Sequence, residues 1–134
     1  MNAAESIQQG RSARARGDRK AARDFYLKAA EIYRHGADRL AYAHTIRHIA
    51  DIYLDESELE SARPLYEEAL EIYRSSLDSR ILDLANTIRP YAILNEGMGN
   101  RDAARSLWEE AIILYASIRV EEGVTECEAH LAKL

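Results

Sequence analysis

The stretch that decides the fold is Ser61-Ala62-Arg63-Pro64-Leu65-Tyr66-Glu67-Glu68-Ala69-Leu70-Glu71-Ile72-Tyr73-Arg74. Counterparts stand forty residues earlier, at 21–34, and forty-two residues later, at 103–116. All three share one pattern: Ala-Arg, two residues, an aromatic residue, two residues, Ala, three residues and Tyr. Each unit of such a repetitive chain buries its apolar face against its neighbours, so the period itself predicts an array of similar helical units.

The segments between these copies repeat as well. Residues 40–53 match residues 82–95 at a spacing of forty-two, with Ala, Thr, Ile and Arg recurring in register. Within the first of them, Ile46, Ile49 and Tyr53 fall at i, i+3 and i+7, which is the stripe of an amphipathic helix. Short polar turns separate the two kinds of segment. Each repeat is therefore predicted to be a pair of antiparallel helices.

Small and aromatic residues recur at fixed places in these pairs. Small residues stand twelve positions before the Ala of each Ala-Arg, and they would let the two helices pack closely. They are Gly10, Ala50 and Ala92. We expect the recurring aromatic side chains to form the core between repeats. They are Phe25, Tyr26, Tyr33, Tyr66, Tyr73, Trp108 and Tyr115. Gly17 and Gly99 fit helix ends that need a positive φ, and Pro64 is expected in the first turn of its helix.

The composition is that of an ordinary globular all-α protein. Of 134 residues, 47% are apolar and 31% are charged, with only two prolines. The formal net charge of -5 disfavours nucleic acid as a partner. Cys127 is the single cysteine, no secretory signal opens the sequence, and no apolar run is long enough to span a bilayer. We therefore expect a cytoplasmic protein with no membrane partner.

At these positions the sequence resembles the tetratricopeptide repeat family, which has a small residue in its first helix and an Ala, an aromatic and another Ala in its second. The matching residues are Ala50, Ala62, Tyr66 and Ala69 in the middle repeat and Ala92, Gly99, Ala104, Trp108 and Ala111 in the third. The run 62–72 is similar to the long repeats, of about forty-two residues, found in kinesin light chains. The resemblance implies an all-α, right-handed α-solenoid of three helix pairs plus a C-terminal capping helix.

The expected organisation is a single domain over the whole chain. The predicted repeats lie at approximately 3–35, 38–76 and 79–116, with the capping helix at 118–134. Ser6 and Gln9 stand where the next repeat has isoleucines, so the first helix is expected to be a polar cap or to be frayed. If the third repeat does not cover Leu131 and Leu134, the last helix could pair with another copy of the chain.

The sequence contains no recognisable catalytic or cofactor motif: it has no glycine-rich phosphate loop, no cysteine pair and no nucleophile elbow. His44, His48 and Asp51 fall at i, i+4 and i+7 and could in principle place three metal ligands on one helix face. No further histidine or cysteine cluster completes that set. We therefore predict no enzyme activity, no cofactor and no metal site, and we keep a metal enzyme built on His44 and His48 as a third alternative.

Arg47 and Arg89 are the residues singled out for ligand binding. Both stand three residues before the small Ala of their helix, a position that in tetratricopeptide repeats tends to face the concave, peptide-binding groove. Kinesin light chain repeats often have Asn there, so Arg suggests an anionic ligand. A guanidinium can fork two hydrogen bonds onto a carboxylate or a phosphate. Helical spacing adds further groove residues, namely His44, Asn86, Asp51, Ile93, Glu96 and Arg11.

A purely structural interpretation of both arginines stays open. Arg47 would then pair with Asp51 four residues on, and Arg89 with a carboxylate of the adjoining repeat. The predicted function is a non-catalytic protein-protein interaction module, or scaffold, that binds a peptide or helix of a partner, favouring an acidic one, in its concave groove. The alternative is a structural protein that forms homo-oligomers through its terminal helices, the C-terminal one above all.

Overall fold

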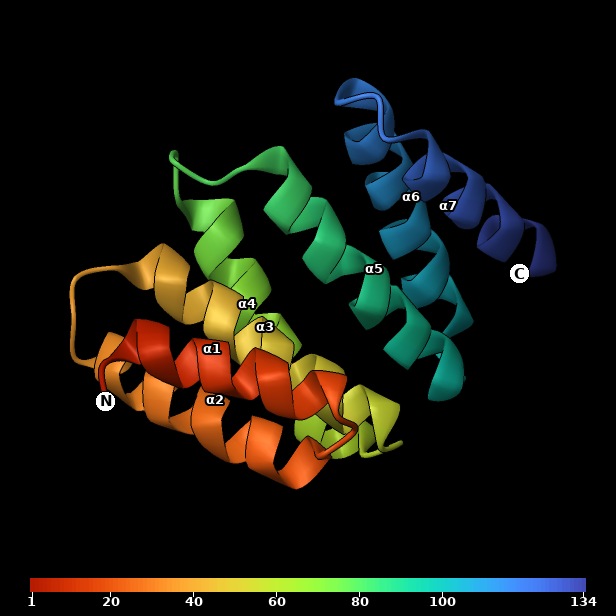
Figure 1. The fold of residues 1–134 in the computed structure, drawn as a ribbon. Coiled ribbons are helices and arrows are strands. Elements are labelled where there is room, and N and C mark those ends of the chain that lie inside the picture. The colour runs from red at the N-terminus through yellow and green to blue at the C-terminus, as the bar shows by residue number, and fades with distance from the viewer. The chain divides into compact units, whose positions relative to one another are not determined.

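The chain folds into seven α-helices, and the computed structural model describes residues 1–134 (Figure 1). The helices are α1 (Ala3–Ala15), α2 (Arg19–Arg34), α3 (Arg39–Asp55), α4 (Leu59–Ser75), α5 (Ile81–Gly97), α6 (Arg101–Ser117) and α7 (Glu121–Lys133). No strand is present, which confirms the all-α prediction. The three copies of the repeat pattern lie in α2, α4 and α6, and the intervening segments form α3 and α5.

The helices gather into two compact units, Met1–Ile72 and Tyr73–Leu134. We call them the N-terminal unit and the C-terminal unit. The boundary lies near the end of α4, so this helix contributes residues to both. The prediction of one domain stays a prediction.

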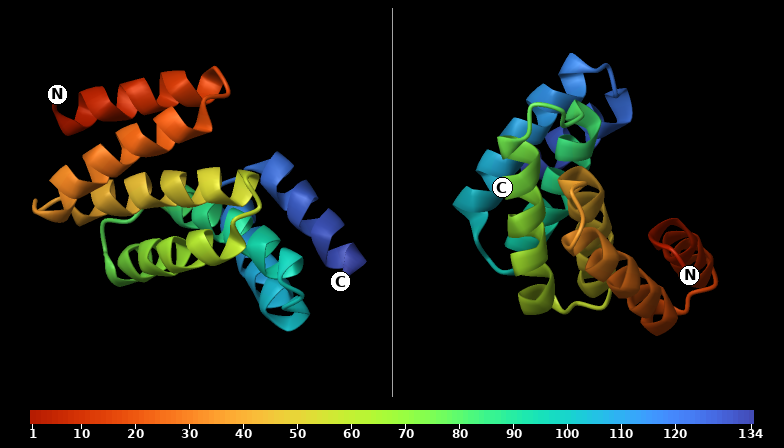
Figure 2. Two further views of the ribbon diagram at one scale, coloured as in Figure 1. Left: turned by 90° about the horizontal axis from the view of Figure 1, so that it is seen from below. Right: turned by 90° about the vertical axis from the view of Figure 1, so that its left-hand side faces the viewer.

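In the N-terminal unit, α1 packs against α2 and α2 packs against α3. Figure 2 shows α1 and α2 running antiparallel from the turn that joins them. Asn2, Asp18 and Asp38 cap the first three helices, because each side-chain oxygen accepts a hydrogen bond from the backbone N–H three residues on, at 2.8, 3.1 and 3.0 Å. The fourth helix joins the unit through Tyr66, whose hydroxyl donates to Asp51 of α3 at 2.5 Å.

In the C-terminal unit, α5 packs against α6 and α6 packs against α7. α6 and α7 lie close together at Gly123, where an added Cβ would lie 2.5 Å from Cγ of Tyr115. The equivalent contact between α1 and α2 is less tight. An added Cβ at Gly10 would lie 3.0 Å from the nearest atom of Tyr26. Glycine is thus required at the α6–α7 contact by space alone.

The repeat pattern forms the packing core of both units. Each Ala of the Ala-Arg pairs, each following aromatic and each second Ala are at most 1% exposed. They are Ala22, Tyr26 and Ala29 in α2, Ala62, Tyr66 and Ala69 in α4, and Ala104, Trp108 and Ala111 in α6. The small residues Gly10, Ala50 and Ala92 are buried as well. Two of the predicted core aromatics, Phe25 and Tyr33, are only half-buried.

Four helix ends share one backbone arrangement, in which a residue with positive φ closes the last turn. They are Gly17, Ser57, Gly99 and Arg119, with φ of 79, 60, 78 and 59°. At each end, the N–H of the next residue donates to the carbonyl five residues back, as Asp18 does to Ala13 at 2.9 Å. The two glycines adopt this conformation as predicted. Ser57 and Arg119 adopt it without the freedom that glycine gives.

Two local expectations need adjustment. The first helix is regular from Ala3 and begins at an Asn2 cap, so it is not frayed, and Ser6 is buried at 1% exposure. Pro64 does not lie in a first turn, because α4 begins five residues earlier, at Leu59. Both Pro64 and Pro90 are accommodated inside continuous helices.

Candidate ligand-binding faces

Arg47 and Asp51 form the ion pair expected from their spacing along α3. Arg47 Nε lies 3.2 Å from Asp51 Oδ2, and the two side chains are 18% and 14% exposed. The contact is electrostatic only, since this buried Nε makes no hydrogen bond. The carboxylate is instead hydrogen-bonded on its other oxygen, Oδ1, by Tyr66. Arg47 therefore neutralises Asp51 without committing its fork to it.

Burial shifts the pKa of both Asp51 and Tyr66. Burial raises the pKa of Asp51, and the nearby Arg47 charge and the Tyr66 hydrogen bond partly offset this. Burial also raises the pKa of Tyr66, and the neighbouring Asp51 charge adds to the effect. Asp51 is thus part of the packing between α3 and α4 as well as a member of the predicted groove.

His48 fills the space between α2 and α3. Its ring stacks on Tyr26, with centroids 5.4 Å apart and an interplanar angle of 7°, and His44 meets it edge-on at 4.6 Å. Burial lowers the pKa of His48 to about 3, and the surrounding charges of Arg47, His44, Arg14 and Arg11 lower it further. The imidazole is therefore neutral at neutral pH, and its Nδ1 has no hydrogen-bond partner.

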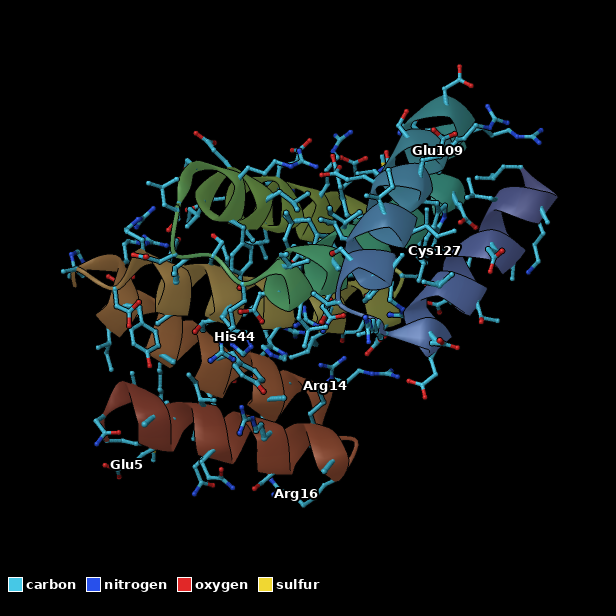
Figure 3. All side chains as sticks on the ribbon, turned by 90° about the horizontal axis from the view of Figure 1, so that it is seen from above. Glu5, Arg14, Arg16, His44, Glu109 and Cys127 are labelled. Atoms are coloured by element: carbon cyan, nitrogen blue, oxygen red, sulfur yellow. The ribbon has the colours of Figure 1, made fainter.

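Two arginines of α1 reach this same region. Arg14 Nη2 binds Asp55 Oδ2 of α3 at 2.9 Å. Figure 3 shows Arg14 on the side of α1 that faces α3, with Arg16 on the opposite side. Arg11, one turn before Arg14, is exposed and forms no ion pair. Burial raises the pKa of Tyr26, and the charges of Arg11 and Arg14 and a hydrogen bond from Arg11 oppose that rise.

The structure thus brings four of the predicted groove residues together in the N-terminal unit. We call this surface the N-terminal face, and it consists of Arg11, Arg14, His44, Arg47 and Asp51. Its three guanidinium groups outnumber the two carboxylates nearby, Asp51 on the face and Asp55 beside it, so the local charge is positive. This is the opposite sign to the chain as a whole.

In the C-terminal unit, Arg89 is held by Glu126 of α7. Arg89 Nε donates to Oε1 at 2.5 Å and Nη2 donates to Oε2 at 2.9 Å, so both carboxylate oxygens are engaged. The side chains are 43% and 32% exposed. This is the pairing with an adjoining repeat that the structural interpretation of Arg89 anticipates.

The other groove residues predicted in this unit have structural partners too. Asn86 accepts a hydrogen bond from the Tyr115 hydroxyl at 2.6 Å. Glu96 accepts one from Trp108 Nε1 at 2.5 Å and lies 2.7 Å from Nδ1 of His130. The Ile93 side chain is half-buried. Asn86 and Glu96 thus accept hydrogen bonds from the phenol of Tyr115 and the indole of Trp108, which would otherwise be buried without partners.

Sequence reasoning missed three residues of these two surfaces. Arg14 could have been found, because it lies one turn beyond Arg11 on the same helix face. His130 could have been found too, because it follows Trp108 by 22 residues, as His48 follows Tyr26. Glu126 has no such signal, because its partner Arg89 lies 37 positions away. His130 stacks on Trp108 at 4.1 Å, just as His48 stacks on Tyr26. The same contact therefore recurs in each unit.

Neither surface has the features of a metal site. No group of three or more His, Cys, Asp or Glu side chains is placed to hold a metal ion. None of the seven helices combines the length and apolar character that a membrane span needs. Cys127 is buried, and burial raises the pKa of its thiol to about 11.

Both the sequence and the fold of the chain are similar to those of known proteins. The family model of the tetratricopeptide repeat matches residues 1–75. The solved structure of BtubC (BKLC) from P. vanneervenii is similar, with a TM-score of 0.56 and 22% sequence identity, over 98% of this chain. The chain spans 47% of the length of that protein. No curated protein matches the sequence significantly.

Proposed function

The chain belongs to the tetratricopeptide repeat family, a fold of protein-protein interaction and scaffolding, and on this premise we propose that it is a non-catalytic module that binds an acidic peptide or helix of a partner. The N-terminal face is the proposed binding surface.

One observation carries this proposal: three arginines share a face with only two carboxylates. Arg11 is exposed and lies outside every ion pair, and Arg47 contacts Asp51 through Nε without a hydrogen bond. A ligand carboxylate would therefore find charge-assisted donors without first breaking a bidentate ion pair. The His44 and His48 rings, which meet edge-on, lie beside them and would offer flat surface to the ligand's side chains.

Surrounding charge favours the same ligand. The low pKa of His48 reflects the positive field of Arg47, Arg14 and Arg11 in addition to burial. A field of this sign attracts acidic segments and disfavours basic ones, and it does so more strongly at low salt. Binding through this face should therefore weaken as the salt concentration rises.

Charge reversal at Arg11 tests the proposal. A fluorescent oligoglutamate peptide is the probe, and its affinity is measured by anisotropy. Arg11→Glu should lower the affinity about tenfold, which corresponds to about 1.4 kcal/mol, because it replaces an exposed donor with a repelling charge. Circular dichroism of the variant would establish that the helices are retained.

Arg16→Glu is the matched control, because Arg16 is exposed at the end of the same helix and lies on the side away from α3 (Figure 3). It changes the net charge by the same amount. Equal loss of affinity in the two variants, or binding of oligolysine as tight as that of oligoglutamate, would contradict an acidic ligand on the N-terminal face.

Self-association through α7 has less support than peptide binding. Leu131 and Leu134 are half-buried within the C-terminal unit, and α7 exposes no large apolar side chain. A homo-oligomer stabilised by that helix would need such a surface. The molecular mass in solution, measured across a range of protein concentrations, distinguishes the two functions.

A further inference from the structure

A pocket of about 410 Å³ lies between α1 and α2, within the N-terminal unit. It is lined by Met1 and Ser6 at the start of α1 and by Lys28, Glu31 and Ile32 in the second half of α2. Figure 2 shows that the two helices diverge from their joining turn toward the N-terminus, which is the end where the pocket lies. The pocket shares no residue with the N-terminal face.

Ser6 stands at a position of the repeat that isoleucine fills elsewhere. Its counterparts, at the repeat spacings of forty and forty-two, are Ile46 in α3 and Ile88 in α5. Those isoleucines are 2% and 0% exposed, so each fills space in the core of its own unit. Serine is smaller, and the space beside it in α1 is open as a pocket. An aliphatic ligand would therefore occupy volume that the repeat elsewhere fills with its own side chain.

The hydroxyl of Ser6 is buried without a partner. Ser6 is 1% exposed, and its Oγ makes no hydrogen bond within the chain. The buried hydroxyls of Thr45 in α3 and Thr87 in α5 differ, since each donates to the carbonyl four residues back, at 2.7 and 2.8 Å. A buried hydroxyl without a partner costs free energy. A ligand acceptor placed at Ser6 would remove that cost.

Lys28 gives the pocket a positive charge that the other repeats lack. Its counterparts in α4 and α6 are both acidic, Glu68 and Glu110. Lys28 is exposed and forms no ion pair, and its ammonium lies 5.5 Å from the centroid of the Phe25 ring. An anionic group in the pocket would therefore find a cation that is not already neutralised.

The remaining lining residues add apolar surface and a carboxylate that has partners of its own. Met1 and Ile32 are 69% and 47% exposed, which is high for large apolar side chains. Glu31 lies 3.6 Å from Arg34 Nη1 and 2.9 Å from His35 Nε2, so basic groups already accompany it. The lining thus combines apolar surface, one unpaired cation and one buried hydroxyl.

We propose that this pocket binds a small aliphatic carboxylate. The carboxylate would accept a hydrogen bond from the Ser6 hydroxyl and pair with Lys28, and the aliphatic body would lie against Met1 and Ile32. The volume is within the range of small-molecule sites, about 300–1,000 Å³. This site is separate from the proposed surface for acidic partners, and either can exist without the other.

The probe is 4-methylpentanoate, whose branched body is similar in size to the side chain that Ser6 replaces. Titration into ¹⁵N-labelled full chain should shift the amide signals of Ser6, Lys28 and Ile32 with saturation, at a dissociation constant on the order of 1 mM. The matched neutral probe is 4-methylpentanamide, which should bind about two- to fivefold more weakly because it forms no ion pair. Equal affinity for the two probes would overturn the proposed ligand class.

Variants assign the two polar contacts. Lys28→Gln should lower the affinity for the carboxylate about two- to fivefold and leave that for the amide unchanged. Lys20→Gln removes the same charge from α2 outside the pocket and should change neither. Ser6→Ala keeps the space, removes the hydroxyl, and should weaken binding about two- to tenfold.

Ser6→Ile tests the pocket itself, because it restores the residue of the other repeats and should abolish binding of both probes. Circular dichroism establishes whether this variant is folded. Wild-type affinity in a folded Ser6→Ile protein would overturn the site. If that variant does not fold, the other two decide, and unchanged affinity in both Ser6→Ala and Lys28→Gln would overturn it. Absence of saturable binding to the wild type would do the same.

Discussion

The two units contain the same repeat, yet the matched arginines have different surroundings. Arg47 lies beside Asp51 of its own helix without a hydrogen bond from Nε, and two arginines of α1 are its neighbours. Arg89 is bound through both nitrogens of its fork by a carboxylate from the next helix. A position in the repeat therefore does not define a binding site by itself, because the neighbouring helix decides whether the guanidinium is free for a ligand.

The stacked histidines of the two units also differ in their polar partners. His48 stacks on Tyr26 in the N-terminal unit, and His130 stacks on Trp108 in the C-terminal unit. His130 has a carboxylate partner, Glu96, whereas Nδ1 of His48 has no partner and the nearby charges are arginines. Burial and the nearby positive charges lower the pKa of His48, so this histidine resists protonation.

The largest expected effect is a loss of stability at low pH, caused by the buried His48. The pKa of His48 is about 3 in the folded chain, against an unfolded value near 6.5, so the unfolded state binds the extra proton between these values. Stability should therefore fall as the pH falls, by up to about 1.4 kcal/mol per pH unit from this group between roughly pH 6 and 4. Urea unfolding at several pH values measures it.

His48→Gln removes the titrating group and should flatten this part of the pH profile. The absolute stability of the variant also changes, because the stacking on Tyr26 is lost, so the slope is the informative quantity. His35→Gln is the control, since His35 is an exposed histidine of the same unit. A wild-type slope in His48→Gln would show that the buried histidine is not the source.

A smaller effect should separate the glycine contacts of the two units. An added Cβ at Gly123 would lie 2.5 Å from the Tyr115 ring, which is closer than Cβ atoms approach other heavy atoms in proteins. An added Cβ at Gly10 would lie 3.0 Å from the Tyr26 ring. Overpacking of this kind costs about 1–3 kcal/mol. Gly123→Ala should therefore destabilise the chain in urea unfolding, even though Ala favours helix by up to about 1 kcal/mol.

Gly10→Ala is the matched comparison. The other repeats carry alanine at the equivalent places, Ala50 and Ala92, and helix propensity offsets a small shift of the Tyr26 ring. We expect its stability to stay within about 1 kcal/mol of the wild type. Equal losses in the two variants would mean that the α6–α7 contact is no tighter than the α1–α2 contact.

The sequence predicts the helices and the core well because the same physical demand recurs in each repeat. A small residue facing an aromatic is needed wherever two helices pack closely, so Ala62 and Tyr66 identify a position in the fold. The surface has no such periodic demand. Asp51 and Glu96 are predicted to face a ligand, and each also accepts a hydrogen bond from an aromatic group of the following helix, which the repeat pattern does not predict.

Partners across helices explain what could not be predicted. The pairing of Arg89 with Glu126 joins residues 37 positions apart, and only the packing of α7 brings them together. The pairing of Arg47 with Asp51 lies within one helix and could be anticipated from spacing. Arg14 belongs to the first kind, since its partner Asp55 lies 41 positions away.

The helix ends provide the smallest test, with one variant in each unit. Ser57 and Arg119 adopt φ of 60 and 59°, where a side chain is strained and glycine is not. Both are exposed. Ser57→Gly and Arg119→Gly should each raise the free energy of unfolding by about 0.5–1 kcal/mol, because the strain relieved exceeds the added flexibility of the unfolded chain.

Gly17→Ala and Gly99→Ala reverse this substitution at the equivalent ends, which have φ of 79 and 78° and open space where a Cβ would lie. Any loss of stability in these two must therefore come from the backbone, and about 1 kcal/mol is expected. If the glycine variants gain nothing while the alanine variants lose stability, the side chains of Ser57 and Arg119 must make compensating interactions. The turns of the two units would then differ in more than their backbone conformation.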